Sequence, residues 1–555
     1  MQTKRKKRPS LIWSFTLGLL ITLTVNMSVQ AAGTIFFFFG PIGLTLNISS
    51  LENFAKTGDV DTNLRTYLRN TTPEQQKEFR QALLEPVPIN PVLLSRFLNT
   101  SIGEDILDRL GRFINIRGRI NGKFAIRGAL IQASFEPDGL TMLGFLRKLP
   151  TDMQIDIQQV LNLTRAIDLV VTATNQFKND IVLLSDAEVK ATPPVDYSLL
   201  SDLRQPGQFK VIKERMVLKD QSRNREFYVD IYRPQTWPAG KTNVIIYSHG
   251  LASRPEDFAR QGEFLASYGF FVALPQHPGS DFQQVQGLLS GLSNQVFSPQ
   301  DFIERPKDVI YLMDELQRRN PTEYGGRLDM QNVGVAGHSF GGYSTLALGG
   351  ATIDFEHLKR QCNAEFAFLN TSLLLQCRAI GMNQDKYNFR DDRVKAVFGA
   401  NPVNSSIFGP EGLRKVTIPV FLAAGTYDPA TPAVFEQVRS FPWINSEDKY
   451  LGVIEGQAHV DFSVLDAGIS STLQSMVNLT LPSPQLVDTY GNAMLVAFFK
   501  VHLAGDESFR PFLESRYFAY ISEGQTFKSY LITTKSSAGL VQKIEEFRRR
   551  YGRIT

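Results

Sequence analysis

Six short apolar segments, separated by longer stretches of helical character, constrain the fold of this 555-residue chain more than any other feature. They are rich in β-branched and aromatic residues and span Val244–Tyr247, Phe270–Leu274, Val333–Ala336, Val394–Phe398, Val420–Ala423 and Tyr450–Ile454. Strands buried on both faces of a parallel sheet have this continuous apolar character, and alternation with helices is typical of βαβ units. Before them, Phe209–Leu218 and Glu226–Tyr232 flank a polar turn and predict an antiparallel hairpin. We therefore expect an α/β protein in which a hairpin precedes a mostly parallel sheet with helices on both faces.

The chain before these segments has a helical character instead. Thr72-Pro73-Glu74-Gln75 has the residue order of a capping box, with proline at the first helical position. Asn90-Pro91 repeats this type of helix start, and apolar residues recur at helical spacing from Ile106 to Phe113. We predict a small, mostly helical domain over 34–190, then a proline-rich linker, a strand-rich domain over 208–505 and a C-terminal extension over 506–555.

The first 31 residues predict a signal peptide. Basic residues run from Lys4 to Arg8, an uncharged apolar stretch follows over Leu11–Val25, and small residues flank Gln30, as at signal-peptidase sites. The apolar stretch is shorter than the ~20 residues that span a bilayer. We expect this segment to be cleaved and the protein to be exported to the periplasm or the extracellular space. A retained membrane anchor is the alternative.

The net charge argues against a nucleic-acid partner. The formal charge of +4 becomes −1 without the five basic residues between Lys4 and Arg8. Proteins that bind nucleic acids normally carry a clustered basic surface. The remaining basic cluster, Arg548-Arg549-Arg550, either contacts anionic lipid headgroups at the membrane or cell envelope or lies on a solvated helix end.

The chain has two cysteines, Cys362 and Cys377, which lie 15 positions apart. In an exported protein such a pair is expected to form a disulfide. Two buried thiols are the alternative. Two cysteines exclude a cysteine-based metal site, and we expect neither a metal nor an organic cofactor.

One motif predicts chemistry: Gly337-His338-Ser339-Phe340-Gly341 has the form G-x-S-x-G. It follows the predicted strand Val333–Ala336 and precedes a helical stretch, which is the context of a nucleophile elbow. The turn in such an elbow is so tight that the serine adopts a strained backbone conformation, and the flanking glycines avoid side-chain clashes. We predict Ser339 as a nucleophile at the carboxyl end of the sheet, with His338 packing in the elbow.

A serine nucleophile needs a general base and an acid that orients this base. His459 lies in the loop after the last predicted strand and is the predicted base. Asp428 follows the strand Val420–Ala423, so the order Ser, Asp, His is that of an elbow-type hydrolase, and Asp428 is the predicted acid. Four other carboxylates are less suitable. Asp354 lies in a long segment that interrupts the alternation of strands and helices, Asp391 and Asp392 precede a strand and so lie at the wrong sheet edge, and Asp461 is too near His459 in sequence.

Two backbone amides are predicted to form an oxyanion hole. The amide of Phe340 directly follows the nucleophile, and that of Leu251 lies in the turn after the first parallel strand. His249 in that turn and His277 after the next strand are candidate pocket residues, whereas His357 and His502 are expected to be structural or exposed. The segments 280–300 and 350–391 interrupt the alternation and are expected to cover the site.

The elbow and the sequence His249-Gly250-Leu251 resemble the type II platelet-activating-factor acetylhydrolases and their bacterial lipase-like, cutinase-like and dienelactone-hydrolase-like relatives. The resemblance covers roughly residues 208–505 and implies the α/β-hydrolase fold and a serine esterase that cleaves short or oxidised acyl groups from lipid-like esters. Leu51–Gly58 resembles a domain of unknown function that precedes such hydrolases in cyanobacteria. The acetylhydrolases carry their acid after an earlier strand, in the turn where this chain has Gly399-Ala400-Asn401-Pro402, so the acid falls to Asp428 as in lipases and cutinases. Dienelactone hydrolases usually have a cysteine nucleophile, so we set that activity aside.

We therefore predict an exported serine carboxylester hydrolase that acts on a small-molecule or lipid-like ester. A peptidase or polyesterase with the same chemistry is one alternative, because an ester and an amide cannot be told apart from these residues. A non-catalytic envelope-binding protein that kept the hydrolase scaffold is the other.

Overall fold

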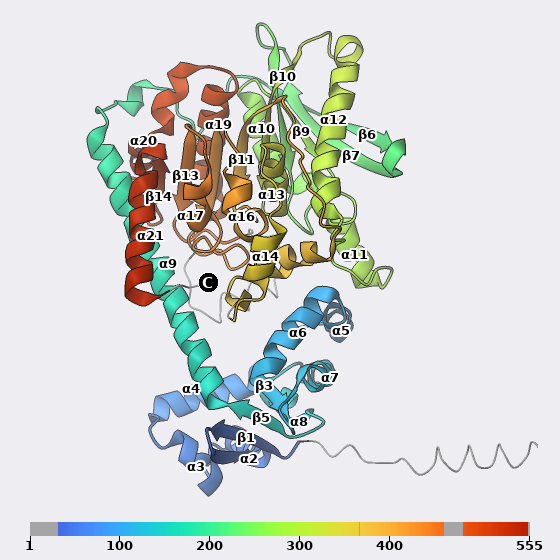
Figure 1. Cartoon of the computed structure of the whole chain (residues 1–555), viewed down its shortest axis with the longest axis vertical. Helices are drawn as coiled ribbons and strands as arrows, with labels where there is room; N and C mark the ends of the chain where they lie inside the picture. The colour runs from blue at the N-terminus through green and yellow to red at the C-terminus, as the bar shows by residue number, and fades with distance from the viewer. Residues whose placement is uncertain (1–31, 366, 460–480, 553–555) are drawn as a thin grey trace, which may run out of the picture. The chain divides into compact units, whose positions relative to one another are not determined.

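A computed structural model of the chain describes residues 32–365, 367–459 and 481–552 (Figure 1). The predicted signal peptide lies outside the described residues. The chain divides into an N-terminal unit, residues up to Pro91 together with Leu110–Gln158, and a large unit, Val92–Arg109 together with Gln159 onward. Among the helices of the described residues, none combines the length and the hydropathy that crossing a bilayer requires.

The large unit is built on a nine-stranded sheet of order β14-β13-β12-β11-β10-β8-β9-β7-β6 (Figure 1). Its strands are β6 Val211–Asp220, β7 Arg225–Pro234, β8 Thr242–Ser248, β9 Phe271–Pro275, β10 Leu328–His338, β11 Val394–Ala400, β12 Val420–Gly425, β13 Lys449–Ile454 and β14 Ser529–Thr533. The pairs β6–β7, β7–β9 and β13–β14 are antiparallel, and the other neighbours are parallel. The predicted hairpin and the six predicted strands are all present. This is the α/β-hydrolase fold.

Helices cover both faces of this sheet, because alternate strand residues face two different apolar cores. Val244 and Val335 belong to one core with α12 and α13, and Ile245 belongs to the other with α10 and α19. The helices of the large unit are α10 Ala259–Ser267, α11 Phe282–Ser290, α12 Asp301–Glu323, α13 Phe340–Leu348, α14 Phe355–Cys362, α15 Leu373–Gln376, α16 Ser405–Leu413, α17 Gln437–Ser440, α19 Pro484–His502, α20 Ser515–Ile521 and α21 Ser537–Tyr551. Helices α5 Pro91–Leu98, α6 Ser101–Phe113 and α9 Ile157–Ala191 each run across a boundary of the two units.

The N-terminal unit contains a small sheet as well as helices. Its strands have the order β2-β1-β5-β3-β4 and are β1 Thr34–Phe39, β2 Ile42–Asn47, β3 Ile114–Ile116, β4 Ile120–Asn121 and β5 Met153–Asp156. Its helices are α2 Ile48–Thr57, α3 Thr62–Leu68, α4 Pro73–Leu84, α7 Lys123–Ser134 and α8 Met142–Arg147. The predicted capping box of α4 is present, with Thr72 and Gln75 bonded reciprocally. The sheet was missed because strands of two to six residues give little alternation in the sequence.

The two segments expected to cover the site, 280–300 and 350–391, each contain short helices. The first contains α11, and the second contains α14 and α15. The predicted disulfide is present in the segment 350–391, where Cys362 at the end of α14 is bonded to Cys377.

Helix α9 and the C-terminal residues are integral to the large unit. Strand β14 extends the sheet beside β13, and Phe177 on α9 packs against Phe547 on α21, with ring centroids 5.3 Å apart. Glu188 on α9 is buried and accepts hydrogen bonds from the Ser515 and Ser536 hydroxyls and from the Thr533 amide and hydroxyl. The structure therefore groups these segments with the sheet, whereas the sequence patterns assigned them to a separate helical domain and a terminal extension.

We expect Glu188→Ala to lower the free energy of unfolding by about 3 kcal/mol, because it leaves several buried donors without an acceptor. Urea unfolding followed by circular dichroism measures this loss. The matched control is Asp186→Ala on the same helix, where the carboxylate is exposed and a change within about 0.5 kcal/mol is expected. Equal losses of unfolding free energy in the two variants would contradict a stabilising role for the hydrogen bonds of Glu188.

Candidate active site

Ser339 lies in the turn between β10 and α13, at the carboxyl end of a central strand. Its φ of 56° and ψ of −116° lie in a region that residues with a side chain rarely adopt, at a cost of order 1–3 kcal/mol. The neighbouring chain holds this conformation: the Ser339 amide donates to the Ala400 carbonyl (2.9 Å), and its carbonyl accepts from the Val403 amide (3.2 Å). A Cβ at Gly341 would lie 2.0 Å from the Ser248 carbonyl oxygen, so the backbones approach too closely for any other residue.

The structure brings Ser339, His459 and Asp428 together in one hydrogen-bonded chain. The Ser339 Oγ lies 2.8 Å from His459 Nε2, and His459 Nδ1 lies 2.7 Å from Asp428 Oδ2. The aspartate follows β12 and the histidine follows β13, which are parallel neighbours in the sheet, so both loops emerge at the edge where the serine turn lies. In this arrangement Nδ1–H donates to the carboxylate, and Nε2 is left to accept the serine proton.

Asp428 is buried and surrounded by donors. The amides of Ala430 and Thr431 each donate to Oδ1 at 2.8 Å, and the Thr431 hydroxyl donates to Oδ2 at 2.8 Å. Burial opposes ionisation, but the charge and hydrogen bond of His459, with the bonds from Thr431 and Asn401, outweigh it and hold the pKa of the carboxyl below its usual range. The carboxylate is therefore charged at neutral pH.

His338 does more than pack in the elbow, because it also forms a hydrogen bond with the loop that carries His459. Its Nε2–H donates to the backbone carbonyl of His459 at 2.8 Å, and the two rings lie 4.7 Å apart. Burial, and secondarily the charge of His459, lowers the pKa of His338 to about 3, so its ring is neutral. It thereby holds the loop that carries His459 beside the serine turn.

The two amides predicted as oxyanion donors belong to segments that adjoin Ser339. Phe340 is the first residue of α13 and is fully buried, and a Cβ built on Gly250, next to Leu251, would lie 3.4 Å from the Ser339 Cβ. Within the described part of the chain, neither amide donates a hydrogen bond to another residue. An N–H group at the first position of a helix has no partner within the helix, so that of Phe340 is available to an anion.

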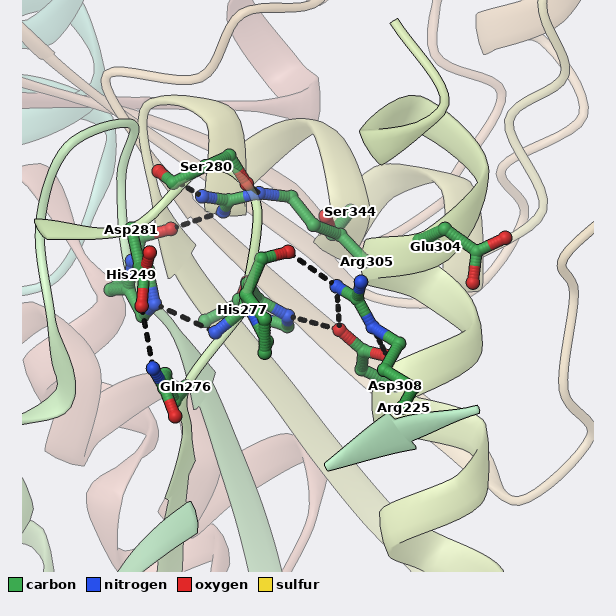
Figure 2. Close-up of polar contacts among 12 residues, drawn as sticks. Arg225, His249, Gln276, His277, Ser280, Asp281, Glu304, Arg305, Asp308 and Ser344 are labelled. Carbon is green, nitrogen blue, oxygen red and sulfur yellow. Dashed lines mark hydrogen bonds and ion pairs between the residues drawn. The ribbon is translucent and has the colours of Figure 1, made fainter. Parts of the chain in front are cut away.

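The remaining candidates lie elsewhere. His249, in the turn after β8, and His277, after β9, are buried in a polar network with Asp308 and Arg305 (Figure 2). The competing carboxylates have other partners: Asp354 caps α14, Asp391 pairs with Arg393 and Asp392 pairs with Arg390. Asp461 lies outside the described residues. His357 contacts Trp443, and His502 Nε2 lies 3.0 Å from the Tyr450 hydroxyl.

Sequence reasoning missed two residues that hold the acid. Asn401 donates through Nδ2 to Asp428 Oδ2, and the Thr431 hydroxyl contacts Asp428 and lies 3.3 Å from His459 Nδ1. Asn401 stands in the turn where the acetylhydrolases carry their acid, and Thr431 lies three positions after Asp428, a spacing typical of a side chain that bonds its own turn. Neither signal by itself distinguishes such a residue from an ordinary turn residue. Among the described residues, no group of three or more His, Cys, Asp or Glu side chains could hold a metal ion.

The buried histidines make stability dependent on pH. Burial lowers the pKa of His249 and His277 well below the usual 6.5 and that of His338 to about 3. Below about pH 6.5 the unfolded chain binds protons that the folded chain does not, so the free energy of unfolding falls by up to about 1.4 kcal/mol per pH unit for each histidine. Burial raises the pKa of Asp301 to about 6, so the folded chain binds a proton there and offsets the contribution of about one histidine.

We therefore expect the free energy of unfolding to decrease between pH 6.5 and pH 5. Urea titrations at pH 7, 6 and 5 measure this decrease. A variant His277→Gln that folds should show a smaller slope, because it lacks one of the groups that titrate only in the unfolded state. A constant or rising free energy over this range would contradict the neutral state of the buried rings.

A comparison with protein families gives a match over the N-terminal part of the chain. Residues 31–156 match the model described as "Alpha/beta hydrolase of unknown function (DUF1400)". The matched segment covers β1 to β5 and precedes the nine-stranded sheet, so it does not include Ser339, Asp428 or His459. It supports the α/β-hydrolase fold without indicating an activity. A comparison with curated proteins finds no match.

Proposed function

We propose that the protein is a serine carboxylester hydrolase that uses Ser339, His459 and Asp428. The serine oxygen attacks the acyl carbonyl carbon while His459 Nε2 takes its proton. The tetrahedral intermediate collapses to an acyl-enzyme, and the alcohol leaves with the proton that His459 returns. Water then attacks the acyl-enzyme, gives its proton to His459, and the acid is released as Ser339 recovers its hydrogen.

One observation supports this proposal above all: the continuous hydrogen-bond chain from Ser339 through His459 to Asp428, with distances of 2.8 and 2.7 Å. The strained serine turn and the two adjoining backbone amides supply the remaining parts, a presented nucleophile and a site for developing negative charge. We propose Leu251 and Phe340 as the amide donors. A non-catalytic binding protein has no physical reason to keep a strained serine that is hydrogen-bonded to a buried histidine–carboxylate pair.

We further propose a lipid-like or short-acyl ester as substrate and an exported location. Both rest on the sequence, through the resemblance to the acetylhydrolase and lipase group and through the features of the first 31 residues. Expression of the full chain with analysis of the mature N-terminus tests export. Cleavage after Ala31 is expected, and an intact N-terminus in a membrane fraction would indicate a retained anchor.

The test of the reaction is labelling with a fluorophosphonate followed by peptide mapping, combined with a panel of p-nitrophenyl esters from acetate to palmitate. We expect a covalent adduct on Ser339 and highest turnover with the short acyl chains. A parallel panel of aminoacyl p-nitroanilides separates an esterase from a peptidase. Absence of both labelling and turnover in folded protein would support the non-catalytic alternative.

A further inference from the structure

Arg305, the fifth residue of α12, is fully buried and binds backbone carbonyls (Figure 2). Its Nη1 donates to the His249 carbonyl at 2.6 Å, and its Nη2 donates to the Gly250 carbonyl at 3.1 Å. Its Nε donates to the Ser280 hydroxyl at 2.8 Å, and Nη2 also reaches the Ser280 carbonyl at 3.3 Å. Within the described residues it forms no ion pair with a carboxylate. Burying a guanidinium is costly, so this use of one needs a reason.

The position of the Gly250 carbonyl determines where the Leu251 amide points. In a planar trans peptide the C=O and the following N–H point in opposite directions. Arg305 holds the Gly250 carbonyl towards the protein interior, so the Leu251 N–H is directed to the other side of that peptide. The Gly250 Cα adjoins the nucleophile, since a Cβ built there would lie 3.4 Å from the Ser339 Cβ. Arg305 and His249 Nδ1, which also donates to the Gly250 carbonyl (2.8 Å), therefore both orient an amide that adjoins the serine.

The same guanidinium contacts the other amide-bearing residue. Its carbon lies 4.4 Å from the centroid of the Phe340 ring, at a cation–π distance. That ring also packs edge-on against Phe302, one turn-length before Arg305 on α12, with centroids 4.7 Å apart. Arg305 thus bridges the two segments that carry the proposed oxyanion donors.

A hydrogen-bonded polar network joins the turn after β8 to the turn after β9 and to α12 (Figure 2). The His277 amide donates to His249 Nε2 at 3.1 Å, so His249 carries its proton on Nδ1, which donates to the Gly250 carbonyl at 2.8 Å. His277 Nδ1 lies 3.0 Å from Asp308 Oδ2, and its Nε2 lies 2.9 Å from the Ser248 hydroxyl. Ser248, His277 and Asp308 thus form a hydrogen-bond chain with the same residue types, in the same order, as Ser339, His459 and Asp428.

This second Ser–His–Asp chain has a different use from the first. Its three side chains are fully buried, and Arg225 binds both oxygens of Asp308 at 2.7 and 2.9 Å. A substrate has no access to a serine enclosed in this way. The neutral rings and the paired carboxylate instead give the turn after β8 a single hydrogen-bonding arrangement.

We propose that Arg305 is a positioning residue that sets the oxyanion hole, by orienting the Leu251 amide through the Gly250 carbonyl and by packing on Phe340. This inference rests on the proposed function. Arg305 touches neither substrate nor reacting atoms. Its contribution therefore appears in the stabilisation of the tetrahedral intermediate and not in the binding of the ester.

The test compares Arg305→Gln and Arg305→Lys in the full chain. We expect kcat for p-nitrophenyl butyrate to fall about 100-fold in Arg305→Gln, near the effect of losing one oxyanion donor, with KM changed less than about threefold. Affinity for an alkyl boronic acid, which forms a tetrahedral adduct on the serine, should fall by a similar factor. Arg305→Lys keeps the charge but reaches fewer carbonyls, so an intermediate loss of about 10-fold is expected.

The matched control is Arg439→Gln. Arg439 is also a poorly exposed arginine that stacks on an aromatic ring, that of Trp443, and donates to the Ser405 and Ser406 hydroxyls, away from the turn after β8. We expect it to lower the unfolding temperature and leave kcat and boronate affinity unchanged. If Arg305→Gln does not fold, Ser280→Ala serves in its place, since it removes only the acceptor of Nε and should lower kcat three- to tenfold.

The outcomes separate this inference from the proposed function. Wild-type protein that hydrolyses no ester and is not labelled on Ser339 overturns both. Wild-type activity with unchanged kcat and boronate affinity in the folded Arg305 variants, or in Ser280→Ala, overturns the positioning role alone. Losses in Arg439→Gln equal to those in Arg305→Gln would also overturn it, because they would reflect stability and not the oxyanion hole.

Discussion

Replacement of Ser339 with alanine is expected to lower kcat/KM for p-nitrophenyl butyrate by about 10⁶-fold, since loss of a serine nucleophile removes the whole covalent route. The backbone amides and the substrate-binding groups remain, so a residual rate above that of water is expected. Stopped-assay hydrolysis with purified variant measures the loss. The unfolding temperature should not decrease, because alanine keeps the turn and removes only a hydroxyl.

The control for this variant is Ser267→Ala. Ser267 is also buried, but it lies at the end of α10, where its hydroxyl donates to the Phe264 carbonyl and accepts from the Gly207 amide. It should retain full activity even if it loses stability. An alanine variant at 339 that keeps more than about one hundredth of the wild-type rate would exclude the acyl-enzyme mechanism.

Asp428→Asn is expected to lower kcat by about 10⁴-fold with little change in KM. An asparagine cannot accept the His459 Nδ1–H and all the present donors without presenting its own NH₂ to one of them, so the imidazole loses the tautomer that leaves Nε2 free. The five donors around the carboxylate, from Asn401, Ala430, Thr431 (amide and hydroxyl) and His459, make this conflict unavoidable. The pH dependence of kcat and KM in the variant measures the effect.

A matched control is Asp392→Asn, whose side chain is 94% exposed and for which wild-type activity is expected. Retention of more than about a tenth of the activity in Asp428→Asn would show that another carboxylate orients the base. Asp461 is then the next residue to replace, since it is the competing carboxylate whose position lies outside the described residues.

The local patterns determined much of the fold. Continuous apolar segments identified six central strands, because a strand covered on both faces has no polar side. The glycines around Ser339 identified the elbow, since only a very tight turn requires them, and Thr72 with Gln75 identified a helix start from local hydrogen-bonding geometry alone. The short strands of the N-terminal unit and strand β14 did not appear, because strands of two to six residues give little alternation in the sequence.

The sequence by itself determined which residues could form the site: a serine in a strained turn, a histidine and an aspartate after two later strands, and a pair of cysteines at disulfide spacing. The tertiary structure alone decided that these side chains meet at hydrogen-bonding distance, that Asn401 and Thr431 hold the acid, and that Arg305 lies beneath the turn after β8. It also decided that α9 belongs with the sheet. The physical reason is that, apart from the local contact between Thr431 and Asp428, these contacts join residues from 27 to more than 300 positions apart. Whether such residues meet depends on strand order and register, which leave no periodic signal in the chain.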